Sequence, residues 1–261
     1  MIENVTLYGG CGRNGRPEPV SRIDLRMGDI VSIVGPTGSG KTTLINDIEL
    51  FADDNTPTRR RLLIDGRVPP PEYKENPSSN PIALITQHTT FLSDLPVGEF
   101  LSAHARIRSQ SDAQTTSLIE ETLSFANQLT GEPISPGSRM TELSGGQTRA
   151  LLIADATVIC DTPIVLLDEV ENAGIHRTRA LELLRRRRKI FIFVTHDPRI
   201  ALLSDFRVVM KGGSMVRLLR TDETERSFSA KVDRLDDLLS KMRDRIRMGE
   251  RLTGAELEGV L

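Results

Sequence analysis

Three short stretches of this chain carry residue types suited to phosphate chemistry. The first, GPTGSGKT at residues 35–42, fits the phosphate-loop pattern G-x-x-x-x-G-K-[ST] and lies between an apolar run and an amphipathic one. Its glycines let the backbone curl, so that successive N–H groups point at phosphate oxygens. Lys41 is suited to the β- and γ-phosphates, and the Thr42 hydroxyl to Mg²⁺. The stretch predicts a nucleoside triphosphate site.

The second stretch, IVLLDE at residues 164–169, reads as an apolar strand that ends in two carboxylates. Asp168 is suited to the Mg²⁺ side, through water. Glu169 is suited to polarise the attacking water as a general base, a role worth about 10²–10⁴ in rate. An acid pair after a strand is also a common helix cap. The phosphate loop elsewhere in the chain favours the catalytic interpretation.

The third stretch, LSGGQ at residues 143–147, places a serine and two glycines before a helical run. Such a helix N-terminus exposes N–H donors and forms a second anion site. One nucleotide loop does not need two phosphate sites so far apart in sequence. Here the chain resembles the ATPase domain of ATP-binding cassette (ABC) proteins, whose signature motif reads LSGGQ. The resemblance covers about residues 1–220.

The resemblance implies how the other parts work. In that family the signature motif contacts ATP on the opposite subunit, so two ATP molecules lie buried in a head-to-tail dimer, homomeric or heteromeric. Gln87 matches the glutamine that senses Mg²⁺ and the attacking water, and His196 matches the switch histidine that contacts the γ-phosphate. Taken alone, either is more often an ordinary surface or core residue.

The expected site can be stated in full. Catalysis is expected from Glu169, His196, Gln87 and Lys41, and Mg²⁺ binding from Thr42, Gln87 and Asp168. Tyr8 is the candidate for stacking on adenine, with an ordinary strand residue as the alternative, because the insertion GGCGRNGRPEP blurs the alignment. The residues expected to bind ATP are Gly35, Pro36, Thr37, Gly38, Ser39, Gly40, Lys41, Thr42, Thr43 and Tyr8, with Ser144, Gly145, Gly146 and Gln147 acting on a neighbour's nucleotide.

The chain departs from the family pattern in two places. After Glu169 it reads VENAGIH, without the proline and the aspartate that are usual there. That segment normally crosses the dimer interface, which puts coupling between the two ATP sites in doubt. Past the signature, Thr148, Arg149 and Ala150 replace the usual Gln/Arg pattern, and Asp155 stands where an arginine is common.

The patterning around these motifs predicts the fold. Short apolar runs rich in β-branched residues alternate with amphipathic stretches, which predicts an α/β fold with a mostly parallel sheet covered on both faces. The resemblance makes this a P-loop NTPase core at residues 1–220 with an inserted helical subdomain at about residues 91–155. The expected strands are 30–34, 82–86, 164–167, 190–195 and 207–210, and the expected helices are 98–107, 116–129, 147–158 and 176–186.

Residues 221–261 are expected to form a C-terminal helical extension. Between residues 228 and 248 the apolar side chains follow helical spacing in a narrow stripe on a highly charged segment. This helix is expected to pack on its own domain or on a second subunit. The basic run 185–189 is expected to be a solvated helix end and not a nucleic-acid patch.

Composition limits the remaining classes. The chain has 261 residues, 38 % apolar and 27 % charged, with a net charge of −2, which disfavours nucleic-acid binding. No apolar run approaches the roughly 18 residues of a membrane span, and the N-terminus lacks the pattern of a signal peptide. Cys11 and Cys160 lie far apart without metal-type spacing. A cytoplasmic location is expected, peripheral at the membrane if a separate permease is the partner.

The chemistry expected is Mg²⁺-dependent hydrolysis of ATP. One hypothesis is the ATP-binding subunit of a transporter, because residues 86–106 resemble the glutamine loop where permeases dock. The other is a soluble ATPase of the same fold that remodels or activates a protein, enzyme or cofactor assembly. The atypical residues after Glu169 and after the signature, and the charged C-terminal helix, favour the second hypothesis.

Overall fold

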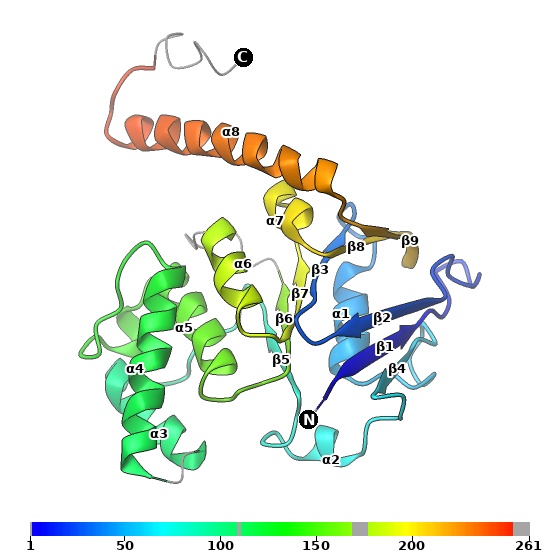
Figure 1. Cartoon of the computed structure of the whole chain (residues 1–261), viewed down its shortest axis with the longest axis horizontal. Helices are drawn as coiled ribbons and strands as arrows, with labels where there is room; N and C mark the ends of the chain where they lie inside the picture. Colours follow the sequence, from blue (N-terminus) through cyan, green and yellow to red (C-terminus); the bar gives the residue numbers. More distant parts are fainter. Residues whose placement is uncertain (1, 109–110, 169–176, 253–261) are drawn as a thin grey trace.

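The computed structural model describes residues 2–108, 111–168 and 177–252. Its main sheet has the strand order β5-β6-β7-β3-β8-β9, in which β9 is antiparallel to β8 and every other pair is parallel (Figure 1). This confirms the predicted α/β fold with a mostly parallel sheet. The strands are β3 (Ile30–Val34), β5 (Ile82–Ile85), β6 (Ile164–Asp168), β7 (Ile190–Val194), β8 (Phe206–Lys211) and β9 (Ser214–Arg220).

A second, antiparallel sheet has the order β2-β1-β4 and comprises β1 (Asn4–Tyr8), β2 (Arg22–Arg26) and β4 (Arg61–Ile64). The sequence analysis does not predict it. The strand β2 reads RIDLR, so only its two apolar side chains are buried, and such a short alternation is hard to separate from a loop.

The four helices expected between residues 98 and 186 are all present, with ends that differ from the expected ones by at most four residues, whereas α7 was not predicted. The described helices are α1 (Lys41–Glu49), α2 (Glu72–Glu75), α3 (Val97–Arg108), α4 (Asp112–Leu129), α5 (Gly145–Thr157), α6 (Arg177–Arg185), α7 (Pro198–Leu203) and α8 (Glu223–Arg247), with a 3₁₀ turn at Met140–Glu142. The short helix α2 lies in a segment predicted to be loop. The longest described helices, α4 and α8, are rich in polar residues, and within the described ranges no helix is able to span a membrane.

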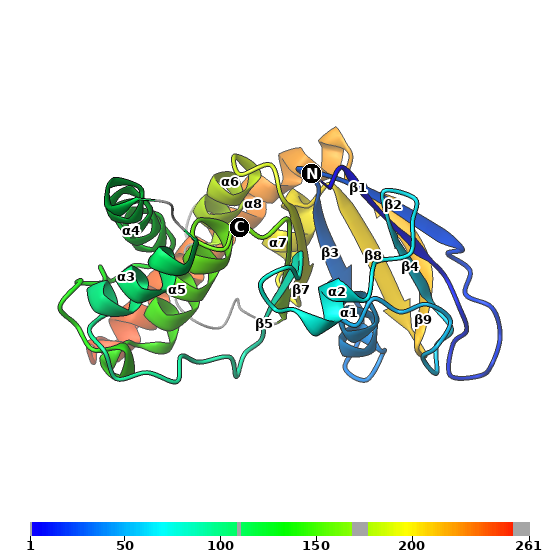
Figure 2. The same ribbon diagram turned by 90° about the horizontal axis from the view of Figure 1, so that it is seen from below.

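Two apolar cores lie on opposite faces of the main sheet. Along β6, Ile164 and Leu166 face one core, whereas Val165 and Leu167 face the other. This period of two is what a strand buried on both sides requires, and it accounts for the uninterrupted apolar run in the sequence. The first core lies under the small sheet and α1, and the second lies under the helices from α3 to α6 (Figure 2).

The helices α3, α4 and α5 pack on one another on the far side of the main sheet from β1, β2 and β4 (Figure 2). This group falls within the segment expected to be the helical subdomain. The exact limits of that subdomain and of the ATPase domain stay predictions.

The C-terminal helix α8 packs on α7 and extends away from it (Figure 1). Arg207 of β8 forms an ion pair with Glu225 in the first turn of α8. Further along, Leu239 and Ile246 remain about half exposed. The helix therefore contacts its own domain through its N-terminal part, which is the first of the two predicted arrangements.

The basic run before β7 is only partly solvated. Arg185 pairs with Asp205, and Arg187 pairs with Glu121. Lys189 is 6 % exposed and pairs with Asp161, so the prediction of a solvated side chain is wrong for this residue. The reason is that Lys189 immediately precedes a fully buried strand and its ammonium group finds a carboxylate in the neighbouring turn.

Candidate nucleotide-binding site

Four predicted site segments meet at one edge of the main sheet. The strands β5, β6, β7 and β3 are consecutive neighbours and run parallel. Asp168 lies opposite Val194, and Val194 lies opposite Ile33, so the carboxyl ends of these strands are level. Ligands of open α/β sheets bind at this edge. The structure thus brings the phosphate loop together with Asp168, and with the segments that carry Gln87 and His196.

The phosphate loop needs glycine at two positions. Gly40, with φ of 101°, precedes α1, and a Cβ there would lie 3.0 Å from Cα of Gly213. Gly35 has φ of 151°, and a Cβ there would lie 2.4 Å from the carbonyl oxygen of Met210. Both positions combine a backbone region that favours glycine with a close approach of the β8–β9 hairpin.

The polar groups of the loop fit an anionic ligand. Lys41 is buried, and its Nζ donates to the carbonyl oxygens of Gly35 at 2.9 Å and Pro36 at 3.3 Å, which places the ammonium group inside the curve of the loop. Ser39 Oγ is buried and has no hydrogen-bond partner among the described residues. A buried hydroxyl without an acceptor favours a ligand that supplies one. The first turn of α1 carries no acidic residue, as an anion site requires.

The same loop offers groups for Mg²⁺. Thr42 and Thr43 are exposed in the first turn of α1, and Asp168 is partly exposed at the end of β6. A hydroxyl and a carboxylate are oxygen donors of the kind that Mg²⁺ takes. The residues present therefore fit a nucleotide with its Mg²⁺ ion, and Thr42 with Asp168 are the pair suited to hold the metal.

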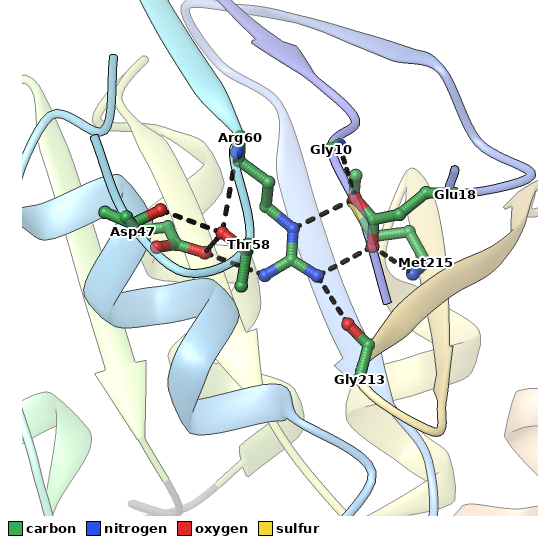
Figure 3. Close-up of polar contacts among 8 residues, drawn as sticks. Gly10, Glu18, Asp47, Thr58, Arg60, Gly213 and Met215 are labelled. Carbon is green, nitrogen blue, oxygen red and sulfur yellow. Dashed lines mark hydrogen bonds and ion pairs between the residues drawn. The ribbon is translucent and has the colours of Figure 1, made fainter. Parts of the chain in front are cut away.

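A buried ionic network holds the loop in place (Figure 3). The Arg60 guanidinium is fully buried between Glu18, at 2.7 Å, and Asp47, at 2.8 Å. Burial opposes the charge, but the hydrogen bonds that Arg60 donates to both carboxylates raise the pKa of Arg60 above its ordinary value. Arg60 also donates to the carbonyl oxygen of Gly213, whose own N–H donates to Ser39 at 2.8 Å. The network thus joins α1, β4 and the β8–β9 turn around the phosphate loop.

Sequence reasoning missed this network. Glu18, Asp47 and Arg60 are far apart along the chain, and each alone looks like a surface charge. Only the fold shows that all three are buried. The one available signal is that Glu18 lies within the insertion GGCGRNGRPEP, which the structure places beside the turn that supports the phosphate loop, through the bond from Met215 N–H to Glu18.

The LSGGQ stretch forms the N-terminus of α5. Ser144 caps the helix by accepting from the Gln147 N–H at 3.3 Å, and the Gln147 side chain accepts from the Ser144 N–H at 2.9 Å. Ser144 and Gly145 are exposed. The first N–H groups of a helix have no acceptor within it, so this end offers donors to a ligand outside its own chain.

Similarity to known proteins decides the family. A family model described as ABC transporter matches residues 20–172, which is more than half of the chain. The chain belongs to this ABC family. It is an ATPase, because hydrolysis of ATP is the activity that characterises the family and the nucleotide-binding loop is present.

Individual relatives agree with this assignment. The chain is 45 % identical to an uncharacterized ABC transporter ATP-binding protein of Methanocaldococcus jannaschii, over 98 % of this chain and 97 % of that protein. It is 31 % identical to the ATP-dependent lipid A-core flippase of Burkholderia pseudomallei, over 82 % of this chain but only 36 % of the flippase. A dimeric ATP-binding cassette bound to ADP and Pi shares the fold, with a TM-score of 0.63 and 23 % identity, over 84 % of this chain and 99 % of that one.

Two features expected of an ABC protein stay predictions. Tyr8 ends β1, and the Arg22 guanidinium lies 5.6 Å from the centre of its ring, so Tyr8 already has a cation–π contact within the small sheet. Its stacking on adenine stays a prediction. Glu169 and the VENAGIH segment lie outside the described residues.

One contact within the ABC site went unnoticed in the sequence. Arg149, just after the signature, donates from Nη2 to the carbonyl oxygen of Gln87 at 2.9 Å. The helix that begins with the signature is therefore bonded directly to the loop that carries the predicted sensor glutamine. The sequence marks Arg149 only as a departure from the family pattern.

Proposed function

We propose that this chain is the ATP-binding subunit of an ABC transporter, and that it hydrolyses MgATP at a head-to-tail interface between two such subunits. The observation that carries the proposal is the contrast between its two anion-binding helix ends. The phosphate loop is assembled within the chain, whereas Ser144 and Gly145 are exposed. The helix end at Ser144 and Gly145 is completed as a binding site by the nucleotide of a partner subunit.

The proposed roles follow from the sheet edge. Lys41 and the N–H groups of residues 35–43 bind the phosphates. Thr42 and Asp168 hold Mg²⁺, which when bound neutralises charge on the phosphate oxygens. Glu169 accepts a proton from the attacking water, while Gln87 orients that water and His196 contacts the γ-phosphate.

The dimer follows from the signature helix. Its N–H donors and the positive end of its dipole favour an anion, and the helix carries no acidic residue in its first turn. The partner is a second ABC subunit, identical or similar, whose ATP is contacted by Ser144, Gly145, Gly146 and Gln147. That an ATP-binding cassette of the same fold is dimeric with ADP and Pi supports this arrangement.

The transport role rests on the relatives and on one surface. The full-length relative is named as an ABC transporter ATP-binding protein. Between β5 and α3, in the predicted permease-docking segment, Leu92 is fully exposed and Leu95 is 44 % exposed. Apolar side chains exposed in this way favour contact with another protein. The chain is then cytoplasmic and peripheral at the membrane, under a separate permease, and does not bind nucleic acid.

A soluble remodelling ATPase is the second candidate. The observation that favours it is α8, which exposes Phe228, Leu235, Leu239 and Ile246 along a charged helix. Such a helix offers a binding surface for a client protein without any membrane component.

Affinity capture distinguishes the two candidates. Tagged Glu169→Gln is expressed in its native cell with ATP, and the proteins that copurify are identified by mass spectrometry. The double variant Glu169→Gln with Lys41→Ala is the matched control, because it has the same surface but no trapped nucleotide. A polytopic membrane protein captured only by the single variant supports the transporter. A soluble enzyme or assembly factor, with no membrane protein, overturns it in favour of remodelling.

A further inference from the structure

A second polar cluster lies at the opposite end of α5 from the signature. His104 projects from α3, Asp155 from the last turns of α5, and Cys160 from the turn that leads into β6. One ligand atom of each residue lies within 4.8 Å of those of the other two. Among the described residues, these are the three His, Cys, Asp or Glu side chains whose ligand atoms lie close enough together to hold a metal ion.

The contacts within the cluster are close and directional. His104 Nδ1 and Asp155 Oδ1 are 2.9 Å apart, so the Nδ1 edge of the imidazole contacts the carboxylate. The other ring nitrogen, Nε2, faces Cys160 Sγ at 3.9 Å, and the same sulfur lies 3.8 Å from Asp155 Oδ2. The main chain of Cys160 is also held next to Asp155, because the Cys160 N–H donates to the Asp155 carbonyl oxygen at 2.9 Å.

We propose that His104, Asp155 and Cys160 form a binding site for a divalent metal ion of the zinc class. A thiolate, an imidazole and a carboxylate are the three ligand types that Zn²⁺ takes in proteins. The nucleotide chemistry proposed above uses none of these residues, so the inference stands independently of it.

The two separations from the sulfur agree with tetrahedral coordination. Bonds of about 2.3 Å to sulfur and about 2.0–2.1 Å to nitrogen or oxygen hold the sulfur about 3.6 Å from each of the other two ligand atoms. The separations from Cys160 Sγ to His104 Nε2 and to Asp155 Oδ2 are 3.9 and 3.8 Å, each within about 0.3 Å of that value. A side-chain adjustment of this size is compatible with rotamer freedom at a half-buried site.

The surroundings stabilise positive charge. The Asp155 carboxylate and the Cys160 sulfur both lie beside the His104 ring, and a carboxylate and a thiolate each bring negative charge to a metal cation. Arg108 lies nearby with its side chain exposed, and it donates to the Cys160 carbonyl oxygen.

The site is accessible, and its position suggests what it does. Cys160 and Arg108 line a surface pocket of about 690 Å³, which gives an ion a path from solvent. A bound ion joins α3 to the connection between α5 and β6, and so ties the helical group to the sheet strand that carries Asp168. Its expected effect is to stiffen the far end of the signature helix, and it does not take part in ATP chemistry.

Cobalt is the direct probe, because a tetrahedral Co²⁺ thiolate absorbs through a sulfur-to-metal charge-transfer band. Nucleotide-free full-length chain is titrated with Co²⁺, and Zn²⁺ is then added to displace it. We expect about one equivalent of Co²⁺ with the thiolate band, lost on adding Zn²⁺. Absence of the band in the wild-type chain overturns the proposal. A metal at the phosphate loop would have oxygen ligands and no such band.

Variants locate the site. Cys160→Ser is expected to abolish the band, whereas the matched variant Cys11→Ser retains it. His104→Gln is expected to weaken Co²⁺ binding at least about 10-fold, while His88→Gln, at an exposed histidine, leaves it unchanged. Zn²⁺ should also raise the Tm of the wild type and of Cys11→Ser but not that of Cys160→Ser, which reports on folded protein. Retention of the band in Cys160→Ser, or its loss in Cys11→Ser, would show that the ion lies elsewhere.

Discussion

The phosphate loop and the signature loop are both helix N-termini preceded by small residues, yet the chain completes only the first. Around the phosphate loop, Lys41 is buried and Arg60 bonds the β8–β9 turn that supports Ser39. At the signature, Ser144 is satisfied by its own capping box and presents the helix end to solvent. Under the proposed function, nucleotide binding is a property of one chain, whereas hydrolysis requires two.

The largest effect on nucleotide binding is expected from Lys41→Ala. Removing this charge should weaken ATP binding by about 30-fold or more, because truncating one partner of a buried charge pair costs about 2–5 kcal/mol. Binding is measured by calorimetry on the purified chain. Lys74→Ala, at an exposed lysine of α2, is the control and should bind ATP as the wild type does. Unchanged affinity in Lys41→Ala would contradict the phosphate-loop assignment.

Arg60→Met tests whether the phosphate loop is supported from within the chain. The change leaves Glu18 and Asp47 buried without their cation, which should lower the free energy of unfolding by about 3–5 kcal/mol. Urea denaturation measures the loss. The neighbouring Arg61 pairs with Asp53 at the surface, so Arg61→Met should cost less than about 1 kcal/mol. Equal losses in the two variants would mean that the buried network adds nothing.

Ser144→Arg tests the signature loop. ATP affinity of the single chain should stay within about twofold, whereas kcat should fall about 100-fold, the effect of losing donors aimed at developing charge. Ser111→Arg is the matched control, because Ser111 caps α4 in the same way at another exposed helix end. A similar fall in kcat for both variants would assign the effect to lost helix capping and not to the neighbour's nucleotide.

The smallest effect is expected from Arg149→Gln. Its bond to the Gln87 carbonyl oxygen links the signature helix to the loop of the predicted sensor. Loss of one hydrogen bond from a charged donor is worth about 1.5 kcal/mol at the low end of its range, which applies because this bond is exposed, and corresponds to about a 10-fold change in kcat. Steady-state kinetics should show this change with ATP affinity unaltered, and Arg106→Gln, at an exposed position on α3, should show none. Wild-type kinetics in Arg149→Gln would show that this bond does not couple the signature helix to the loop that carries Gln87.

Local patterns were sufficient for the motifs and for the five parallel strands of the main sheet, but not for its antiparallel strand β9. The apolar run of β6, the glycines of the phosphate loop and the capping box of LSGGQ are each encoded within fewer than ten residues. The topology brings Asp168 and the phosphate loop to one edge of the sheet. The assignment of individual catalytic roles stays a prediction.

What the sequence did not reveal depends on pairing over long separations. Arg60 meets Glu18 from 42 residues away, and His104 meets Asp155 from 51 residues away. Charge alone does not distinguish a buried partner of this kind from a solvated residue, which is also why the prediction for Lys189 was wrong. Cys160 was dismissed for lacking metal-type spacing, because that criterion detects only ligands that lie close together in sequence.

The measurement that tests the central claim most directly is the mass of the ATP-trapped complex. Glu169→Gln is purified from its native cell with MgATP, and native mass spectrometry counts the ABC subunits and nucleotides. The account predicts two ABC subunits, either two copies of this chain or one with a similar partner, holding two ATP molecules, and loss of this pair when Ser144→Arg is added. A single ABC subunit with ATP bound, or a pair that persists with Ser144→Arg, would contradict it.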